Sequence, residues 1–481
     1  MESIKVSTLK GFVWKLAQSV GAQVVSFLVQ LVLARILTPE DYGVVAIVSI
    51  FTNIAMVFIN VGFSSAIIQK SNLTDRDIST IFYVNMFLSI IIYAILFFSA
   101  PLIAKFYDNL ELISMLRISS LIVIIGGSYS IPQALLTRDL EFKKSSIACF
   151  LGALIQGLTG IYLALKGLGS WALIYSSLMN YIVCGFVICL MKKWCPKLVF
   201  SKKALLENIG FSLKIFLTEF FNSVFNNVRA IIIGKQYTTS DLAYYNKGNQ
   251  IPTLIMVAVD GSMTSVLFPA LSKYQDNWKK GLLVLRRSMK LSLFVCAPIM
   301  LGLFAVARPV ILFLLTEKWN ESVQYVQIGC IICLFWPLSA QRHALNARGY
   351  SGVTLFLNVT GKIITLIFLL LTCKHSAQIM VLSTVFSSFV TMIIEAIIFQ
   401  KYLDYNIKQQ IKDILPIIVI AVVMAIVVYP IQFLGMNNFV TIVIQVSVGI
   451  IVYLLLSKIC RIDSLDYIIG LIKGFLSKSK K

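Results

Sequence analysis

The sequence is poor in charged residues and in histidine, and it has no long polar segment. Of its 481 residues, 13% are charged and only two are histidine, whereas about a quarter of a soluble domain is charged. One water-soluble core cannot absorb the 58% of residues that are hydrophobic, because single cores stop growing at about 250–300 residues. A cytosolic enzyme, a disordered scaffold and a secreted disulfide-linked module are therefore excluded. We predict an all-α integral membrane protein.

Motifs of catalysis and of metal binding are also missing. The chain contains no P-loop, no H-E-x-x-H and no G-x-S-x-G, and His343 and His375 fall in different loops. Most of the nine cysteines lie in apolar runs. Cys330 and Cys333 form a C-I-I-C motif without a second pair, which we interpret as packing. We expect a protein that is not an enzyme and that holds no cofactor and no metal.

Fourteen apolar runs follow one another along the chain, each about as long as the 20 residues that a helix needs to cross a membrane. Irregular backbone cannot face lipid, so each run is predicted to be a transmembrane helix. The fourteen predicted spans cover residues 11–34, 43–67, 78–100, 112–131, 146–165, 170–191, 208–233, 242–268, 283–306, 322–345, 352–372, 377–400, 411–433 and 437–456.

The distribution of Lys and Arg predicts how these spans are oriented. With the N-terminus inside, and with residues near the span ends counted with the adjoining segments, the cytoplasmic segments carry 30 of the 42 Lys and Arg residues and the outer segments carry 8. The other four, Lys214, Arg229, Lys247 and Lys362, are counted within spans. Positive residues concentrate in cytoplasmic loops, so both termini are predicted to be cytoplasmic. This topology also explains the net charge of +21, which in a soluble protein would suggest nucleic acid.

An internal repeat divides the first twelve spans into two halves. Residues 35–43 match residues 235–243 at an offset of 200, and two further short segments match in the same order. Six spans in each half give both halves the same orientation, with a pseudo-twofold axis along the membrane normal. The predicted domains are an N-lobe (1–200, spans 1–6), a C-lobe (201–402, spans 7–12), spans 13 and 14 (403–458) and an amphipathic cytoplasmic tail (459–481).

Polar residues recur on one face of spans 1, 2, 7 and 8, as 100° per residue requires. Four such stripes favour a wet central cavity that the two halves share. The alternative is hydrogen bonding between helices, which Ser, Thr and Asn provide in many bundles. The residues predicted to line the cavity are Gln23, Gln30, Asn53, Asn60, Asn222, Asn226, Asn249 and Thr253.

Charged residues within the spans are the candidates for binding, because a charge at the bilayer centre costs about 2.5–3.5 kcal/mol. Glu219 and Asp260 are the predicted coupling carboxylates. Lys362 lies about 16 Å into span 11, near the midplane, and a structural pair with Glu219 is the alternative role for it. Glu395 lies nearer a span end, where snorkelling can explain a charge. The cations predicted to contact substrate are Lys362, Arg229, Lys214 and Lys15.

Several short motifs stand out along the chain, in residues 33–43, 61–69, 132–143, 167–173, 233–235, 242–246 and 268–269. As a set they resemble the motifs of bacterial polysaccharide flippases. These proteins form the lipopolysaccharide and capsule-export branch of the multidrug/oligosaccharidyl-lipid/polysaccharide exporter superfamily. Many members carry an acidic residue before the Ile-Gly-Lys run at 233–235, where this chain has Arg229.

The resemblance implies two six-helix lobes that move an undecaprenyl-diphosphate-linked oligosaccharide across the bacterial cytoplasmic membrane by alternating access. The product would be lipopolysaccharide, capsule or exopolysaccharide. The implied partners are this lipid-linked substrate, membrane lipids, a proton or sodium ion for coupling, and a polymerase with chain-length machinery. One alternative is a cation-coupled exporter of drugs or other small molecules with the same fold. A membrane-embedded glycosyltransferase or polymerase would need a catalytic group in a sizeable extramembrane loop, and the sequence has no such loop.

The predicted topology places residues 192–203 in the cytoplasm. A cysteine in this segment should react with a membrane-impermeant maleimide in opened cells and stay unmodified in intact cells. Labelling of the segment from outside intact cells would show that the topology is wrong.

Overall fold

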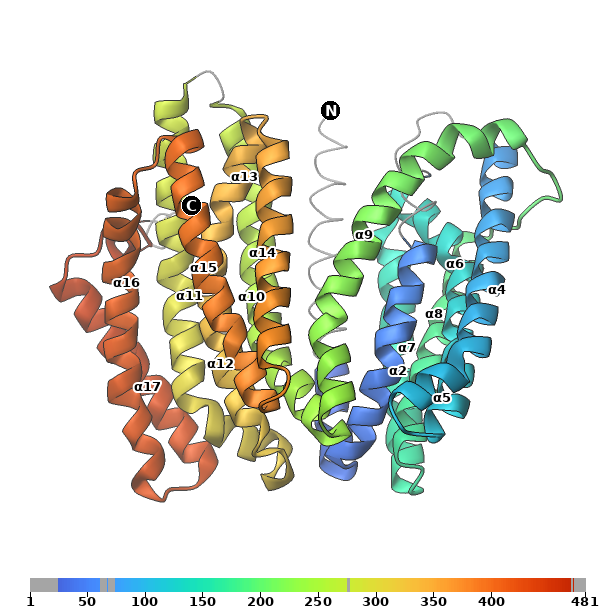
Figure 1. Ribbon diagram of the computed structural model, residues 1–481, viewed down its shortest axis with the longest axis horizontal. Helices are drawn as coiled ribbons and strands as arrows, with labels where there is room; N and C mark the ends of the chain where they lie inside the picture. Colours follow the sequence, from blue (N-terminus) through green and yellow to red (C-terminus); the bar gives the residue numbers. More distant parts are fainter. Residues whose placement is uncertain (1–24, 61–66, 68–73, 275–276, 469, 471–481) are drawn as a thin grey trace, which may run out of the picture. The chain divides into compact units, whose positions relative to one another are not determined.

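The computed structural model of this protein describes residues 25–60, 67, 74–274, 277–468 and 470, and the regular elements within them are helices (Figure 1). Eleven helical segments of this part are long and apolar enough to cross a membrane. The predicted all-α membrane class is therefore confirmed. The chain divides into two compact units, residues 1–243 (the first unit) and 244–481 (the second unit).

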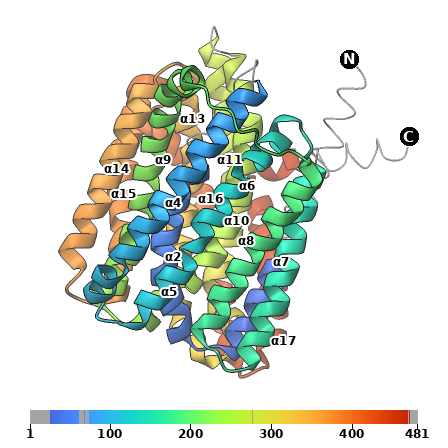
Figure 2. The same ribbon diagram turned by 90° about the vertical axis from the view of Figure 1, so that its right-hand side faces the viewer.

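The first unit packs its helices through small residues. Figure 2 shows α7 beside α8. The two helices can lie this close because Gly152 of α7 has no side chain. A methyl group there would lie 2.6 Å from Oδ1 of Asn180 on α8. The helices are α2 (Pro39–Asn60), α4 (Asp75–Phe106), α5 (Glu111–Ser119), α6 (Leu121–Arg138), α7 (Phe142–Leu165), α8 (Ser170–Lys192) and α9 (Lys202–Gln236), and α10 (Thr239–Ser272) leads into the second unit.

The second unit is built around α11, which packs against α12, α16 and α17. A hydrogen bond links α11 to α17, since the Tyr453 hydroxyl of α17 donates to the backbone oxygen of Phe294 on α11 at 2.9 Å. The helices are α11 (Trp278–Leu315), α12 (Ser322–Leu334), α13 (Ala340–Ala347), α14 (Ser351–Thr372), α15 (Ala377–Leu403), α16 (Ile407–Val428) and α17 (Asn438–Ile459), with 3₁₀ turns η1 (Glu317–Trp319), η2 (Trp336–Ser339) and η3 (Tyr429–Leu434).

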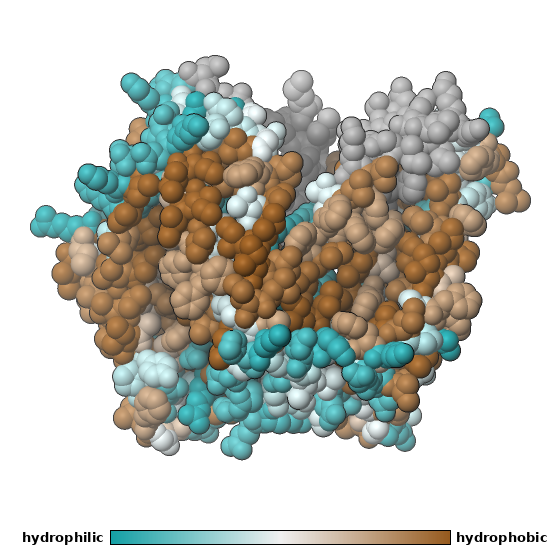
Figure 3. Space-filling model, viewed as in Figure 1, coloured by the Kyte–Doolittle hydropathy of each residue, from teal (hydrophilic) through white to brown (hydrophobic). Residues whose placement is uncertain are grey.

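Large apolar side chains cover the outer faces of these helices. Phe98 is 76% exposed and Leu371 is 70% exposed. In Figure 3 the middle of the helices is mostly hydrophobic, and hydrophilic residues gather toward the helix ends. Water would penalise so much exposed apolar surface, whereas lipid covers it at no cost.

Several helices differ from the predicted spans in length and continuity. The predicted span 283–306 is part of α11, whose 38 residues extend over about 57 Å. The predicted span 322–345 is interrupted by η2, where Pro337 offers no backbone N–H to the helical ladder. The predicted span 112–131 is divided between α5 and α6.

Helices α9 and α10 coincide with predicted spans 7 and 8 but are not among the eleven apolar segments. They are 35 and 34 residues long, sufficient to cross a membrane, and carry more polar residues than the others. Of the first predicted span, residues 25–36 form a helix, and the rest lies outside the described residues. The count of fourteen spans and their orientation stay predictions.

Two turns of the predicted repeat have the same hydrogen bonds. The backbone N–H and hydroxyl of Thr38 donate to Oδ2 of Asp41 at 3.0 and 2.8 Å. Thr238 donates to Asp241 in the same way, at 3.1 and 2.8 Å. Both turns cap the helix that follows, which is why this short sequence pattern occurs twice.

Along the sequence, the boundary between the two compact units falls between residues 243 and 244, whereas the predicted lobe boundary falls between residues 200 and 201. The difference arises because α9 packs against α2 and α4 of the first unit. The predicted lobes follow the sequence repeat, whereas the compact units follow packing. The lobes and the predicted tail, which lies mostly beyond the described residues, stay predictions.

Candidate functional site

Some of the predicted site residues lie outside the part of the chain that the structure describes. Lys15 and Gln23 precede residue 25, and the side chains of Asn60, Lys214 and Asp260 are also outside it. The structure describes the side chains of the other predicted residues, Gln30, Asn53, Glu219, Asn222, Asn226, Arg229, Asn249, Thr253 and Lys362.

In the first unit, α2 and α9 pack on each other and both present polar residues. Asn53 of α2 is exposed, as are Glu219 and Asn226 of α9. Asn222 and Arg229 follow the same face of α9 at helical spacing and are half-buried. Carboxylates and amides midway along a membrane helix need water or a polar ligand. This face is therefore a candidate wall for a polar cavity. Gln30, in the helical segment that precedes α2, is half-buried.

Two residues of the polar stripe predicted on span 8, Asn249 and Thr253, lie on α10 in the second unit. Thr253 is exposed and donates its hydroxyl proton to the backbone oxygen of Asn249 at 2.7 Å. Asn249 itself is half-buried, so its amide faces both the protein and the surroundings of α10. The role of the two residues in lining a cavity stays a prediction.

A row of polar residues on α14 extends the predicted Lys362 position. Asn358 is exposed and lies four residues before the half-buried Lys362, so the two share one face of the helix. Arg342 of α13 donates from Nη1 to Oδ1 of Asn358 at 3.1 Å. It also donates to Oε1 of Glu395 on α15, with 3.1 Å between Nε and Oε1 and a further contact from Nη2. We call Arg342, Asn358, Lys362 and Glu395 the cationic row.

The charges of the cationic row are unequal. Glu395 is buried, with its side chain 9% exposed, and its negative charge is balanced by Arg342. Lys362 adds a second positive charge, so the row holds two cations and one carboxylate. Among the described residues, Arg342 uses three of its five N–H groups for Glu395 and Asn358, which leaves two for a ligand.

The burial of Glu395 corrects one expectation from the sequence. Its carboxylate does not snorkel toward the membrane surface, because it is held by Arg342 inside the unit. Neither Arg342 nor Asn358 was predicted from the sequence as a site residue. Two signals were available, since Arg342 begins residues 342–348, which match residues 133–138 of the repeat, and Asn358 precedes Lys362 by one helical turn.

The described residues offer no group of three His, Cys, Asp or Glu side chains that could hold a metal ion. All nine cysteines are free thiols, and the Sγ atoms of Cys149 and Cys184 lie 4.0 Å apart between α7 and α8. The polar chemistry available to a ligand in this part of the chain is thus that of amides, hydroxyls, carboxylates and cations.

A family described as polysaccharide biosynthesis protein matches residues 32–324, more than half of the chain. The succinoglycan biosynthesis transport protein ExoT of Rhizobium meliloti (strain 1021) is 24% identical over 306 residues, or 64% of this chain and 62% of ExoT. The chain thus spans less than two thirds of ExoT. The teichuronic acid biosynthesis protein TuaB of Bacillus subtilis (strain 168) is 24% identical over 371 residues, 74% of each chain. The lipopolysaccharide biosynthesis protein WzxC of Escherichia coli (strain K12) is 22% identical over 338 residues, 69% of this chain and 68% of WzxC.

Two solved structures share the fold of this chain. The lipid II flippase MurJ in an inward closed conformation superimposes with a TM-score of 0.76 at 18% identity, covering 94% of this chain and 99% of MurJ. An inward-facing multidrug resistance transporter of the MATE family, of the MOP superfamily, gives a TM-score of 0.61 at 15% identity, covering 81% and 98%. At such identities the likeness concerns the fold, and it confirms the predicted fold class in its general form.

The ion pair of the cationic row makes a prediction about stability. Arg342→Ala leaves the buried Glu395 carboxylate unpaired, which should cost about 3–5 kcal/mol and lower the melting temperature of the detergent-solubilised protein. Combining Arg342→Ala with Glu395→Gln removes the uncompensated charge and should recover most of the loss.

The exposed pair of Glu141 and Lys144 is the matched control, with side chains 35% and 42% exposed. Lys144→Ala should change stability by about 0–1 kcal/mol. If the double variant of the cationic row were as unstable as Arg342→Ala alone, the loss would not arise from an unpaired charge.

Proposed function

Because the chain belongs to the polysaccharide biosynthesis protein family, we propose that it is a flippase for a lipid-linked oligosaccharide. The resemblance seen in the sequence motifs is confirmed by the family match, and the chain is a multi-pass protein of the bacterial cytoplasmic membrane. In the proposed activity, an oligosaccharide linked through a diphosphate to undecaprenol moves from the inner to the outer leaflet. The names of the relatives support a role in polysaccharide biosynthesis, and MurJ is itself named a lipid II flippase.

The observation that carries this proposal is the cationic row. A diphosphate needs cations and N–H donors, and charge-assisted hydrogen bonds to phosphate are strong where water is scarce. Lys362 supplies a compact charge near the predicted midplane, and Arg342 has two N–H groups beyond those used by Glu395 and Asn358. Arg229 is proposed as a second cation on the path, and the exposed amides of Asn53 and Asn226 as partners for sugar hydroxyls.

Alternating access would require one side of the path to close while the other opens. In the first unit, the end of α9 packs on α2 and α4, and the start of α10 contacts α2, at the side that is predicted to be outside. A methyl group on Gly43 of α2 would lie 1.9 Å from the carbonyl oxygen of Thr239, so the two backbones touch. Nζ of Lys235 lies 2.8 Å from Oδ2 of Asp108 and 5.2 Å from the ring centre of Phe106. We call this set of contacts the exterior contact.

The interactions of the exterior contact are weak, as a reversible closure requires. Asp108 is 80% exposed and Lys235 is 33% exposed, and ion pairs this open are worth about 0–1 kcal/mol. Next to them, the Tyr107 hydroxyl is buried and has no hydrogen-bond partner among the described residues, which itself costs about 1–3 kcal/mol. Burial raises the pKa of Tyr107 to about 12, so it stays a neutral donor. Separation of α9 from α4 would let water reach this hydroxyl.

The second candidate function is a cation-coupled exporter of small molecules, since the MATE transporter shares the fold. Two cations against one carboxylate in the cationic row favour an anionic substrate over a cationic drug. Glu219, exposed on α9, and Asp260 are proposed as coupling carboxylates for a proton or sodium ion. A polysaccharide polymerase with its chain-length machinery is the proposed protein partner, and no nucleic-acid partner or catalytic step is proposed.

Deletion of the gene should cause a lipid-diphosphate-linked oligosaccharide to accumulate in the cells, which mass spectrometry of lipid extracts can identify. The wild-type gene should clear this pool. Lys362→Ala should insert normally and fail to clear it, and Lys362→Arg should clear it in part because the charge is kept while its geometry changes. If cells that lack the gene accumulated no such lipid, the result would contradict the proposed function.

The exterior contact can be tested by cross-linking in a background that lacks the nine native cysteines. Joining Asp108→Cys to Lys235→Cys with a cleavable thiol reagent should halt clearance of the lipid-linked sugar, and cleavage should restore it. The control joins Asp139→Cys to Lys192→Cys, an ion pair between α6 and α8 within the predicted N-lobe, and should leave clearance unchanged. Normal clearance with α9 joined to α4 would show that the exterior contact does not open.

A further inference from the structure

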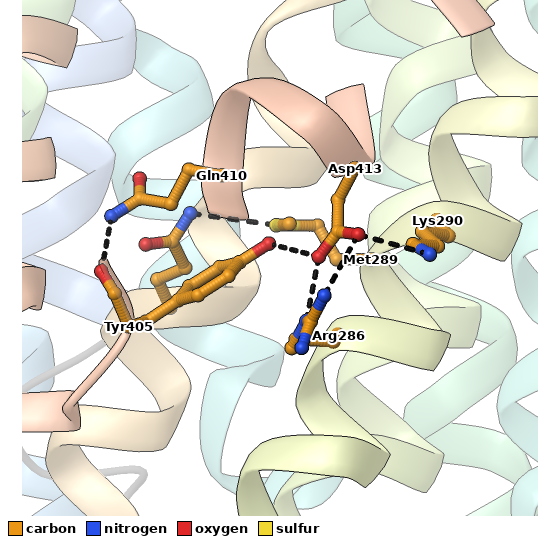
Figure 4. A network of polar contacts seen from close by, with 7 residues as sticks. Arg286, Met289, Lys290, Tyr405, Gln410 and Asp413 are labelled. Carbon is orange, nitrogen blue, oxygen red and sulfur yellow. Dashed lines mark hydrogen bonds and ion pairs between the residues drawn. The ribbon is translucent and has the colours of Figure 1, made fainter. Parts of the chain in front are cut away.

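The buried carboxylate of Asp413 on α16 forms ion pairs with two cations of α11 (Figure 4). Arg286 donates from Nε and Nη2 to the two oxygens of Asp413 at 2.6 and 3.0 Å, and Nζ of Lys290 lies 2.9 Å from Oδ1. The Tyr405 hydroxyl donates to Oδ2 at 2.8 Å, and Gln410 holds the Tyr405 backbone oxygen at 2.8 Å. Burial and the bond to Asp413 raise the pKa of Tyr405, which keeps its proton for this contact.

Asp413 is saturated by these partners, but the cations are not. Its side chain is 2% exposed, whereas those of Arg286 and Lys290 are 26% and 29% exposed. Within the described part of the chain, Arg286 uses two of its five N–H groups for hydrogen bonds and Lys290 uses one of three. The cluster therefore has a net charge of +1 and several N–H donors that reach the surface. Lys412, beside Asp413 in sequence, is exposed as well.

The cluster lies near the predicted cytoplasmic end of the membrane-spanning part of α11. Helix α11 is about 57 Å long, whereas the hydrocarbon layer is about 30 Å thick, so a centred α11 would extend about 13 Å beyond the layer on each side. Arg286 lies eight residues, or about 12 Å, from the start of α11 at Trp278. The Trp278 indole N–H donates to the backbone oxygen of Leu403 at 2.8 Å, at the level where tryptophan favours membrane interfaces.

Exposed apolar side chains, here called the apolar stripe, lie near this cluster on both helices. Leu283 of α11 is 63% exposed one turn before Arg286 and Arg287. On α16, Ile411, Leu415 and Val419 are 52%, 53% and 49% exposed, on the outer face that turns away from Asp413. A free phosphate would gain nothing from the apolar stripe, whereas the acyl chains of a lipid would lie against it.

We propose that Arg286 and Lys290, held in place by Asp413, bind the phosphate headgroup of an anionic phospholipid of the inner leaflet. Basic pockets between membrane helices on the cytoplasmic side recognise such headgroups. Asp413 acts as a positioning residue, because it fixes both cations at the junction of α11 and α16 and leaves their remaining donors to the lipid. This site is formed by helices other than α13–α15, which carry the cationic row, and it does not depend on the proposed transport activity.

The test measures retention of phosphatidylglycerol and phosphatidylcholine by the full-length purified protein, using native mass spectrometry. Lys290→Gln keeps the paired Arg286 and Asp413, so the fold should survive, and phosphatidylglycerol affinity should fall about fivefold with no change for phosphatidylcholine. Arg286→Gln with Lys290→Gln should lower it further. Lys279→Gln with Lys280→Gln, two exposed lysines on the same helix, is the matched control and should change it little.

Two outcomes would overturn the proposal. Equal retention of phosphatidylglycerol by the wild type and Lys290→Gln would show that the cluster only holds α11 and α16 together. Inorganic phosphate that displaces phosphatidylglycerol at equal concentration would show that the cluster binds a free anion and that the apolar stripe adds nothing. Because no transported sugar is needed, a failed flippase assay would leave this measurement unaffected.

Discussion

The hydrocarbon of a membrane offers no partner to a charged side chain, and the second unit is organised by that constraint. Glu395 and Asp413 are both buried, and each is held by an arginine from another helix. These pairs join α13 to α15 and α11 to α16, in addition to the apolar packing of the same helices. Each cluster has one carboxylate and two positively charged side chains, so cations outnumber carboxylates by one. An excess of this kind has a use only where an anion can approach, at the membrane interface or on a polar path.

The positions of the helices could be predicted from the sequence, because crossing a lipid layer requires long apolar runs and the loops between them are short. Breaks within a helix were harder to predict. The predicted span 322–345 contains Pro337, whose effect on the helical ladder is known, yet its hydropathy is continuous and gives no sign of the 3₁₀ turn. The two long polar helices, α9 and α10, were predicted from apolar runs like the others, and the regular alternation of charged loops agrees with their placement.

The pairs within the sites could not be predicted in the same way. Lys362 was identified because a lone cation in an apolar run is conspicuous. Asp413 and Arg286 each stand near a span end, where a charge needs no explanation, and they are 127 residues apart in sequence. Only packing shows that the two meet. The same holds for Arg342, which stands near the end of the predicted span 322–345 and gains significance from the buried Glu395 it contacts on α15.

The two matching turns show how a repeated sequence can yield unequal structure. Thr38 with Asp41 and Thr238 with Asp241 form the same cap, so each half begins its second helix identically. At the fifth position after the threonine, however, the first turn has Gly43 and the second has Ala243. The missing side chain lets α2 rest on the Thr239 carbonyl, and a methyl group could not be accommodated without moving the backbone. Glycine at this one place therefore permits a close backbone contact between the two turns. The ion pair beside it, Lys235 with Asp108, is exposed and weak, so little free energy is needed to separate such a contact.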